Sequence, residues 1–171
     1  MATISKKICL IGDFGVGKTS LIRRFVERQF SDQYLSTVGV KISRKTVELI
    51  EPTPQKMQLL IWDLEGHTKF KSIAPSYLKG ASGAIVVGDV TRQETIDNIP
   101  ERANLFLEVN PKGIMIFALN KSDLVDEDKL ANMPQFKDFE QVIATYPTSA
   151  KTGSYVDEIF QKLAYAMLAL A

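Results

Sequence analysis

Gly12-Asp13-Phe14-Gly15-Val16-Gly17-Lys18-Thr19 fits the pattern G-x-x-x-x-G-K-[ST] and stands between an apolar run at 8–11 and a helical pattern at 18–27. Its glycines allow the backbone to curl until successive N–H groups point inward and form a nest for an anion. The first turn of the following helix, which includes Ser20, adds partial positive charge. We therefore predict that residues 12–20 bind the phosphates of a nucleotide, with Lys18 on the terminal phosphates and the Thr19 hydroxyl on Mg²⁺.

Short apolar runs alternate with longer amphipathic segments along the rest of the chain. The runs lie at 8–11, 59–62, 84–87, 114–119 and 142–144, and the helical patterns at 18–27, 70–79, 95–109, 127–132 and 155–170. This alternation predicts βαβ units. Residues 40–50, with the turn-like segment 51–54 after them, predict an antiparallel hairpin at one edge. The expected fold is α/β, with a six-stranded, mostly parallel sheet, one antiparallel edge strand and helices on both faces.

Composition and length indicate one soluble globular domain over residues 1–171. The formal net charge of +1 gives no bulk attraction to nucleic acid or to an anionic membrane, so we expect neither as a partner. Cys9 stands in an apolar run, which predicts a buried core side chain. The N-terminus has no signal pattern, Ala2 excludes myristoylation, and no cysteine near the C-terminus offers a prenylation site. We expect a cytoplasmic monomer without a membrane anchor in this chain.

The segment Asn120-Lys121-Ser122-Asp123 follows the apolar run 114–119. Asp123 can accept two hydrogen bonds, from N1–H and from the exocyclic amino group of guanine, whereas adenine lacks both donors and leaves the carboxylate unpaired. Asn120 is expected to tie the loop together, and the Lys121 stem to lie over the base. Ser149-Ala150-Lys151 follows the run 142–144, where the Ala150 N–H can donate to guanine O6. Together these segments predict a guanine site.

Trp62-Asp63-Leu64-Glu65-Gly66 follows the run 59–62. A carboxylate at the end of a strand that faces the phosphate loop suits Mg²⁺, so we predict Asp63 as a ligand through water. A helix N-cap is the alternative role for Asp63. The Gly66 N–H is placed to donate to the γ-phosphate.

In this order, the segments at 12–19, 37–39, 62–66, 120–123 and 149–151 resemble the motifs of the Ras superfamily of small GTPases, most of all its Rab branch. The resemblance covers nearly the whole chain and implies a P-loop NTPase G domain. It implies that Thr37 closes over the γ-phosphate and binds Mg²⁺ in the GTP state, that Phe30 packs against guanine and that Tyr34 covers the phosphates.

The resemblance further implies two switch segments, near 30–40 and 63–79, which the γ-phosphate orders. Effectors, an exchange factor and an activating protein are the implied partners. Phe70, Ile73 and Tyr77 either form an apolar partner face or pack on the sheet. Residues 31–38 contain no arginine, so this segment supplies none of its own to the transition state.

The sequence departs from the family pattern at His67, which stands where the family has a glutamine that orients the attacking water. Translational GTPases place a histidine after the same motif. His67 is therefore either a catalytic residue that a partner positions or an idle side chain in a weak enzyme.

A second departure is Phe14, where the family has a small residue; its ring beside the γ-phosphate predicts slow intrinsic hydrolysis unless the ring folds away. The lipidated tail of the family is also absent, as expected of a relative without it, such as a bacterial one, or of a trimmed chain.

These residues support a GTP-hydrolysing switch first and a GTP-binding scaffold with negligible turnover second. A P-loop kinase or ATPase is a third possibility, which the segment 120–123 disfavours.

Overall fold

The computed structural model describes residues 3–30, 40–64, 75–136 and 138–170. The strands are β1 (Thr3–Gly12), β2 (Val40–Leu49), β3 (Gln55–Leu64), β4 (Gly83–Asp89), β5 (Ile114–Asn120) and β6 (Val142–Pro147). The helices are α1 (Lys18–Glu27), α2 (Pro75–Leu78), α3 (Gln93–Asp97), α4 (Ile99–Val109), α5 (Glu127–Ala131) and α6 (Val156–Ala169), with a short 3₁₀ turn, η1, at Ser122–Leu124.

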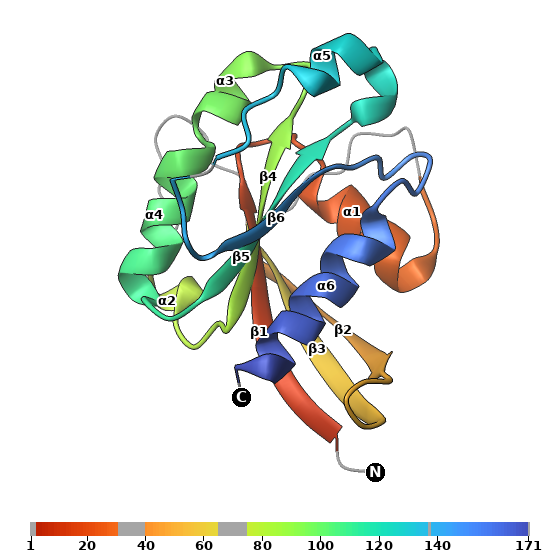
Figure 1. Ribbon diagram of the computed structural model, residues 1–171, viewed down its shortest axis with the longest axis vertical. Helices are drawn as coiled ribbons and strands as arrows, with labels where there is room; N and C mark the ends of the chain where they lie inside the picture. Colours follow the sequence, from red (N-terminus) through yellow and green to blue (C-terminus); the bar gives the residue numbers. More distant parts are fainter. Residues whose placement is uncertain (1–2, 31–39, 65–74, 137, 171) are drawn as a thin grey trace.

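The strands form one six-stranded sheet in the order β2-β3-β1-β4-β5-β6 (Figure 1). All neighbouring pairs are parallel except β2 and β3, which are antiparallel through the turn at residues 50–54. The predicted mostly parallel sheet with an antiparallel edge strand is therefore confirmed. The chain runs outward from β1 in both directions, so the loop after β1 lies where the order of strands reverses, which is the usual ligand position in such sheets.

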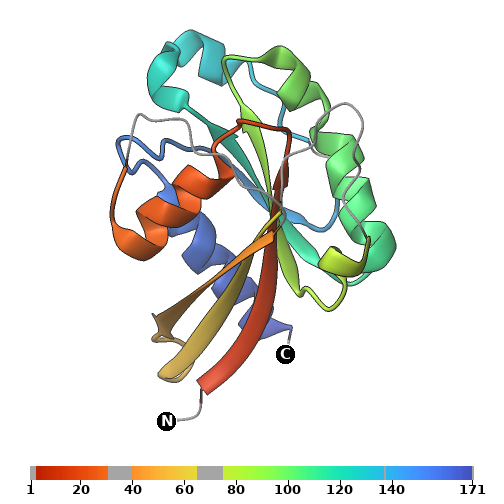
Figure 2. The same cartoon turned by 180° about the vertical axis from the view of Figure 1, so that it is seen from behind.

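Two layers of helices cover the sheet, because the central strands alternate their apolar side chains between its faces. In β1, Ile8 and Leu10 pack in the cluster that includes residues of α1 and α6, whereas Cys9 and Ile11 pack in the cluster under α2, α3 and α4. Figure 2 shows the same two layers from behind. Cys9 is fully buried, as the sequence predicts.

The helical pattern at 95–109 is two helices, so the prediction of one helix there is wrong. α3 ends at Asp97, Asn98 lies between the helices, and Pro100 stands in the first turn of α4. Proline lacks an N–H and fits the start of a helix but not its interior, so the helix restarts there. The pattern at 70–79 is confirmed only as α2, since residues 65–74 lie outside the described part.

Every parallel strand ends at the same edge of the sheet, which is the upper edge in Figure 1. The phosphate loop, Asp63 near the end of β3 and both predicted base segments lie at this edge. The first and last described residues lie at the opposite end. No helix in the described residues is long and apolar enough to cross a lipid bilayer.

Candidate functional site

The phosphate loop connects β1 to α1, and its backbone takes the shape that its glycines permit. Gly15 and Gly17 have positive φ values of 75° and 102°, and Gly17 is the N-cap of α1. A Cβ on Gly17 would lie 2.3 Å from Nδ2 of Asn120, so a side chain at this position is excluded by sterics as well as by backbone conformation. The loop therefore needs glycine where α1 begins.

Lys18 is buried at 6% exposure, and its Nζ donates to the carbonyl oxygens of Gly12 and Asp13 at 3.0 and 3.1 Å. Burial lowers the pKa of Lys18 to about 8, although the nearby Asp63 and Asp13 carboxylates raise it. An ammonium held by backbone carbonyls inside the loop is placed to exchange them for phosphate oxygens.

Thr19 and Asp63 meet beside the loop. The Thr19 hydroxyl donates to Oδ2 of Asp63 at 2.5 Å, and Asp63, at the end of β3, is 1% exposed. A hydroxyl oxygen and a carboxylate are hard oxygen donors of the kind that Mg²⁺ prefers, so these two residues fit such an ion. Ser20 is half-buried in the first turn of α1.

Asn120 joins three segments at the end of β5. Its Nδ2 donates to the Val16 carbonyl of the phosphate loop at 2.9 Å, and its Oδ1 accepts from the Thr148 hydroxyl at 3.1 Å. Thr148, directly after β6, is fully buried. The loop-tying contact expected of Asn120 is present.

Lys121 holds the phosphate loop from the same side. Its Nζ donates to the Gly15 carbonyl at 3.0 Å and lies 2.8 Å from Oδ2 of Asp89. Burial alone would raise the pKa of Asp89, but hydrogen bonds from Lys121 and Thr91 bring it below its ordinary value. These contacts favour the ionised form of Asp89, which pairs with Lys121.

Asp123, in η1, is exposed and faces the loop after β6. The Ser149 hydroxyl donates to its Oδ1 at 2.8 Å, while the Thr152 N–H donates to the Ser149 hydroxyl at 3.1 Å. Ser149 and Ala150 are buried, and Lys151 is exposed. The two predicted base segments are thus one hydrogen-bonded unit.

Other predicted residues divide into those placed and those outside the described part. Phe14 and Phe30 are exposed at 43% and 36%. Tyr77, for which the sequence leaves both a partner face and packing on the sheet open, is exposed at 42%. The rest, Tyr34, Thr37, Gly66, His67, Phe70 and Ile73, lie outside the described residues.

Sequence reasoning missed Asp89, Thr148, Arg92, Asn98 and Arg102. Asp89 ends a buried strand and Thr148 precedes Ser149, so position along the chain was an available signal for these two. Asn98 and Arg102 contact Asp13, and Arg92 contacts Phe14, across a sequence gap of 78 residues or more. No short sequence motif predicts contacts between residues that lie so far apart in the chain.

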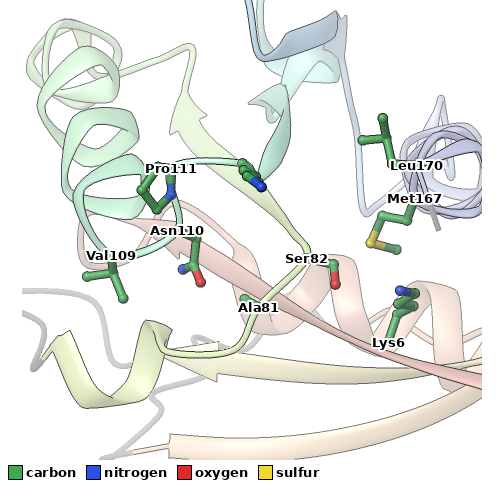
Figure 3. A pocket seen from close by; sticks show the side chains of 10 residues that line it. Lys6, Ala81, Ser82, Val109, Asn110, Pro111, Met167 and Leu170 are labelled. Atoms are coloured by element: carbon green, nitrogen blue, oxygen red, sulfur yellow. The ribbon is translucent and has the colours of Figure 1, made fainter.

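A cavity of about 560 Å³ lies at the other end of the sheet, between the start of β5 and the end of α6 (Figure 3). Lys6, Pro111, Met167 and Leu170 are among its lining residues. None of the residues predicted to bind nucleotide lines it. This cavity is therefore separate from the site at the carboxyl edge, which is the edge of the sheet where the parallel strands end.

Comparisons with known proteins agree with this geometry. The Ras family matches residues 7–169 of the chain. The chain is 36% identical over 167 residues to GTP-binding protein ypt5 of Schizosaccharomyces pombe, covering 96% of this chain and 78% of the relative. It is 37% identical over 164 residues to Ras-related protein Rab-13 of Canis lupus familiaris (95% and 79%) and 38% identical over 164 residues to Ras-related protein RABF2b of Arabidopsis thaliana (95% and 80%). With this match over nearly its whole length, the chain belongs to the Ras family, as a Rab-like small GTPase.

Proposed function

We propose that this chain is a single G domain that switches between GTP and GDP at the carboxyl edge of its sheet. It hydrolyses GTP slowly, and residues near 30–40 and 63–79 report the γ-phosphate to partner proteins. The observation that carries the proposal is the position of Asn120, whose side chain joins the phosphate loop at Val16 to the base segment at Thr148. This contact supports a site in which one segment binds the phosphates and the other binds the base, at a constant distance from each other.

Each residue has a role that follows from its chemistry. Residues of the loop from Gly12 to Gly17 give N–H groups to the phosphates, and Lys18 gives its ammonium. Asp123 accepts from guanine, and the Ser149 hydroxyl orients its carboxylate. Thr19 and Asp63 hold Mg²⁺ together with Thr37, and the ion neutralises charge on the phosphates.

The test is the identity of the nucleotide that copurifies with the protein, followed by competition for a fluorescent GDP analogue. We expect GDP or GTP to be released on denaturation, and unlabelled GDP but not ATP to compete. Asp123→Ala is expected to weaken GDP binding by about 100-fold or more, because guanine loses two hydrogen-bond acceptors.

Asp128→Ala is the matched control, since Asp128 is an exposed aspartate on α5 near η1. We expect this variant to bind GDP as the wild type does. Equal competition by ATP and GDP, or no bound purine nucleotide at all, would refute the proposed function.

A second candidate function is a GTP-dependent scaffold with negligible hydrolysis. It is favoured by Phe14, whose ring stands 43% exposed in the phosphate loop, and by His67 in place of glutamine. Phosphate release from bound GTP, measured with and without cell extract, separates the two candidates. Release that extract accelerates supports the enzyme, and no release under either condition supports the scaffold.

A further inference from the structure

Asp13 places a carboxylate in the phosphate loop, and its side chain turns to the junction of α3 and α4. Arg102 of α4 donates to Oδ1 of Asp13 from Nη2 at 2.7 Å and from Nε at 3.2 Å. Asn98 donates from Nδ2 to Oδ2 at 2.7 Å. The Arg102 and Asp13 side chains are only 15% and 14% exposed. Both oxygens of a largely buried carboxylate are therefore engaged by helix residues.

Asn98 is the N-cap of α4 and leaves the usual role of that position unfilled. Asparagine is among the best N-cap residues because its side-chain oxygen accepts from an N–H of the first turn. Here no side-chain cap bond is made, and the Asn98 amide is directed to Asp13 instead. The junction between the helices is thus built around the carboxylate.

Phe14, the residue after Asp13 in the phosphate loop, is also bound by a residue at the start of α3. Arg92, the N-cap of α3, donates from Nη2 to the Phe14 carbonyl at 2.7 Å, and its Nε lies 3.2 Å from Oδ2 of Asp89. The loop is therefore fastened to α3 and α4 at two consecutive residues, Asp13 and Phe14.

The charges explain why such a fastening matters. Without a counter-ion, a carboxylate in this loop repels the phosphates, and a partly buried site screens that repulsion poorly. Arg102 neutralises Asp13, and Arg92 and Arg102 both add positive potential at Lys18, whose pKa they lower further after the main effect of burial. The repulsion that Arg102 removes grows with the charge of the ligand, so it is larger for GTP than for GDP.

We propose that Arg102 and Asn98 are positioning residues that hold the Asp13 carboxylate, neutralised, away from the bound phosphates and so set the affinity for GTP relative to GDP. This inference rests on the proposed function. It concerns the phosphate half of the site, which the base-recognition test with Asp123 leaves untouched.

The experiment measures dissociation constants of GTP and GDP, each with Mg²⁺, for the wild type, Arg102→Gln, Asp13→Asn and the double variant. We expect Arg102→Gln to weaken the binding of GTP about tenfold or more and the binding of GDP about threefold. The reason is that the freed Asp13 carboxylate repels the more highly charged ligand more strongly. In the double variant no carboxylate remains at position 13, and we expect GTP affinity to return to within about threefold of the wild type. At high salt we expect Arg102→Gln to lose less GTP affinity, because salt screens the repulsion between the carboxylate and the phosphates.

Arg28→Gln is the matched control. Arg28 makes a 2.6 Å pair with Asp157 between the end of α1 and α6, with side chains 58% and 41% exposed and no part in the loop. This variant is expected to bind both nucleotides as the wild type does.

Three results would overturn the inference while leaving guanine binding intact. They are an unchanged GTP affinity in Arg102→Gln, an equal loss for GTP and GDP, or a loss that Asp13→Asn does not relieve. A loss that Asp13→Asn does not relieve would show that Arg102 acts through packing and not by neutralising Asp13. Thermal unfolding of each variant without nucleotide shows whether it is folded. If Arg102→Gln does not fold, Arg102→Lys takes its place, and we expect that variant to retain part of the GTP affinity. A wild type that binds no guanine nucleotide refutes the proposed function itself.

Discussion

Lys18 is a buried cation, and in the proposed site the phosphates of the nucleotide supply its counter-charge. In the structure its ammonium donates to two carbonyl oxygens, and burial lowers its pKa to about 8 against the opposing effect of the Asp63 and Asp13 charges. A bound phosphate favours the charged form, so the pKa of Lys18 rises on binding. Binding then takes up a proton wherever the free lysine is neutral.

Nucleotide affinity should therefore fall with pH only above the pKa of the free lysine. From pH 7 to pH 8.5 we expect about a fourfold weakening of GDP binding, measured by titration with a fluorescent analogue. Lys18→Met should bind weakly across the range and lose this dependence. The range ends below the pH at which guanine loses its own N1 proton. A wild-type affinity that rises over this range would contradict the prediction.

We expect the Phe14 side chain to affect the rate of GTP hydrolysis more than the affinity for nucleotide. Its ring is exposed at the phosphate loop, while its carbonyl accepts from Arg92. If the ring excludes a water-positioning side chain, Phe14→Gly should speed single-turnover GTP hydrolysis about 3–10-fold, a change of about 1 kcal/mol in the barrier. Phe14→Leu keeps the bulk and should stay slow. Equal rates in all three proteins would remove the steric explanation.

Helices α1 and α6 are joined by a stacked aromatic pair, Phe25 and Phe160, with ring centroids 4.1 Å apart and planes at 5°. Both side chains are fully buried. α1 carries Lys18 and Thr19, and Arg24 of α1 donates to the Lys151 carbonyl beside the base segment at 3.0 Å. Packing between these two helices thus supports both halves of the site.

Replacing Phe160 with alanine should lower the free energy of unfolding by about 3–5 kcal/mol, because it removes a large buried ring and leaves a cavity. Urea denaturation gives this value. Leu170→Ala, at a side chain 68% exposed after α6, should change it by no more than about 0.5 kcal/mol. A loss for Phe160→Ala as small as for Leu170→Ala would show that the helices do not depend on this pair.

The elements that sequence reasoning predicted well are those with a local signal. β5 reads as a continuous apolar run because it is buried on both faces, and α6 repeats its buried residues at helical spacing. The split between α3 and α4 was missed although Pro100 marks it, because the amphipathic pattern continues across the break. Arg102 was missed for a different reason: its partner Asp13 lies 89 residues earlier, and only the completed sheet brings them together.

The proposed nucleotide site draws on the end of β3 and on the segments after β1, β4, β5 and β6, so we expect its occupancy to stabilise the complete fold. With GDP at 100 times its dissociation constant, linkage adds about 2.7 kcal/mol to the free energy of unfolding. For a chain of this size, that corresponds to a rise in melting temperature of about 5–11 °C. Differential scanning fluorimetry of nucleotide-free protein with GDP and Mg²⁺ measures it. ATP should give no shift, and the same GDP concentration should raise the melting temperature of Asp123→Ala by no more than about 1–2 °C. A shift with ATP comparable to that with GDP would contradict guanine selectivity.

The Asn120 side-chain amide donates to the carbonyl of Val16, which lies 104 residues earlier in the chain. This separation has a consequence for synthesis of the protein. A chain leaves the ribosome with its N-terminus first, so the phosphate loop emerges long before Asn120 and Thr148 can brace it. Until β5 and β6 have followed, the nascent polypeptide has the proposed phosphate loop but lacks both of the proposed guanine-binding segments. We therefore expect the nucleotide to bind only near the end of translation. An arrested ribosome whose exposed chain stops before β5 should retain no radiolabelled GDP.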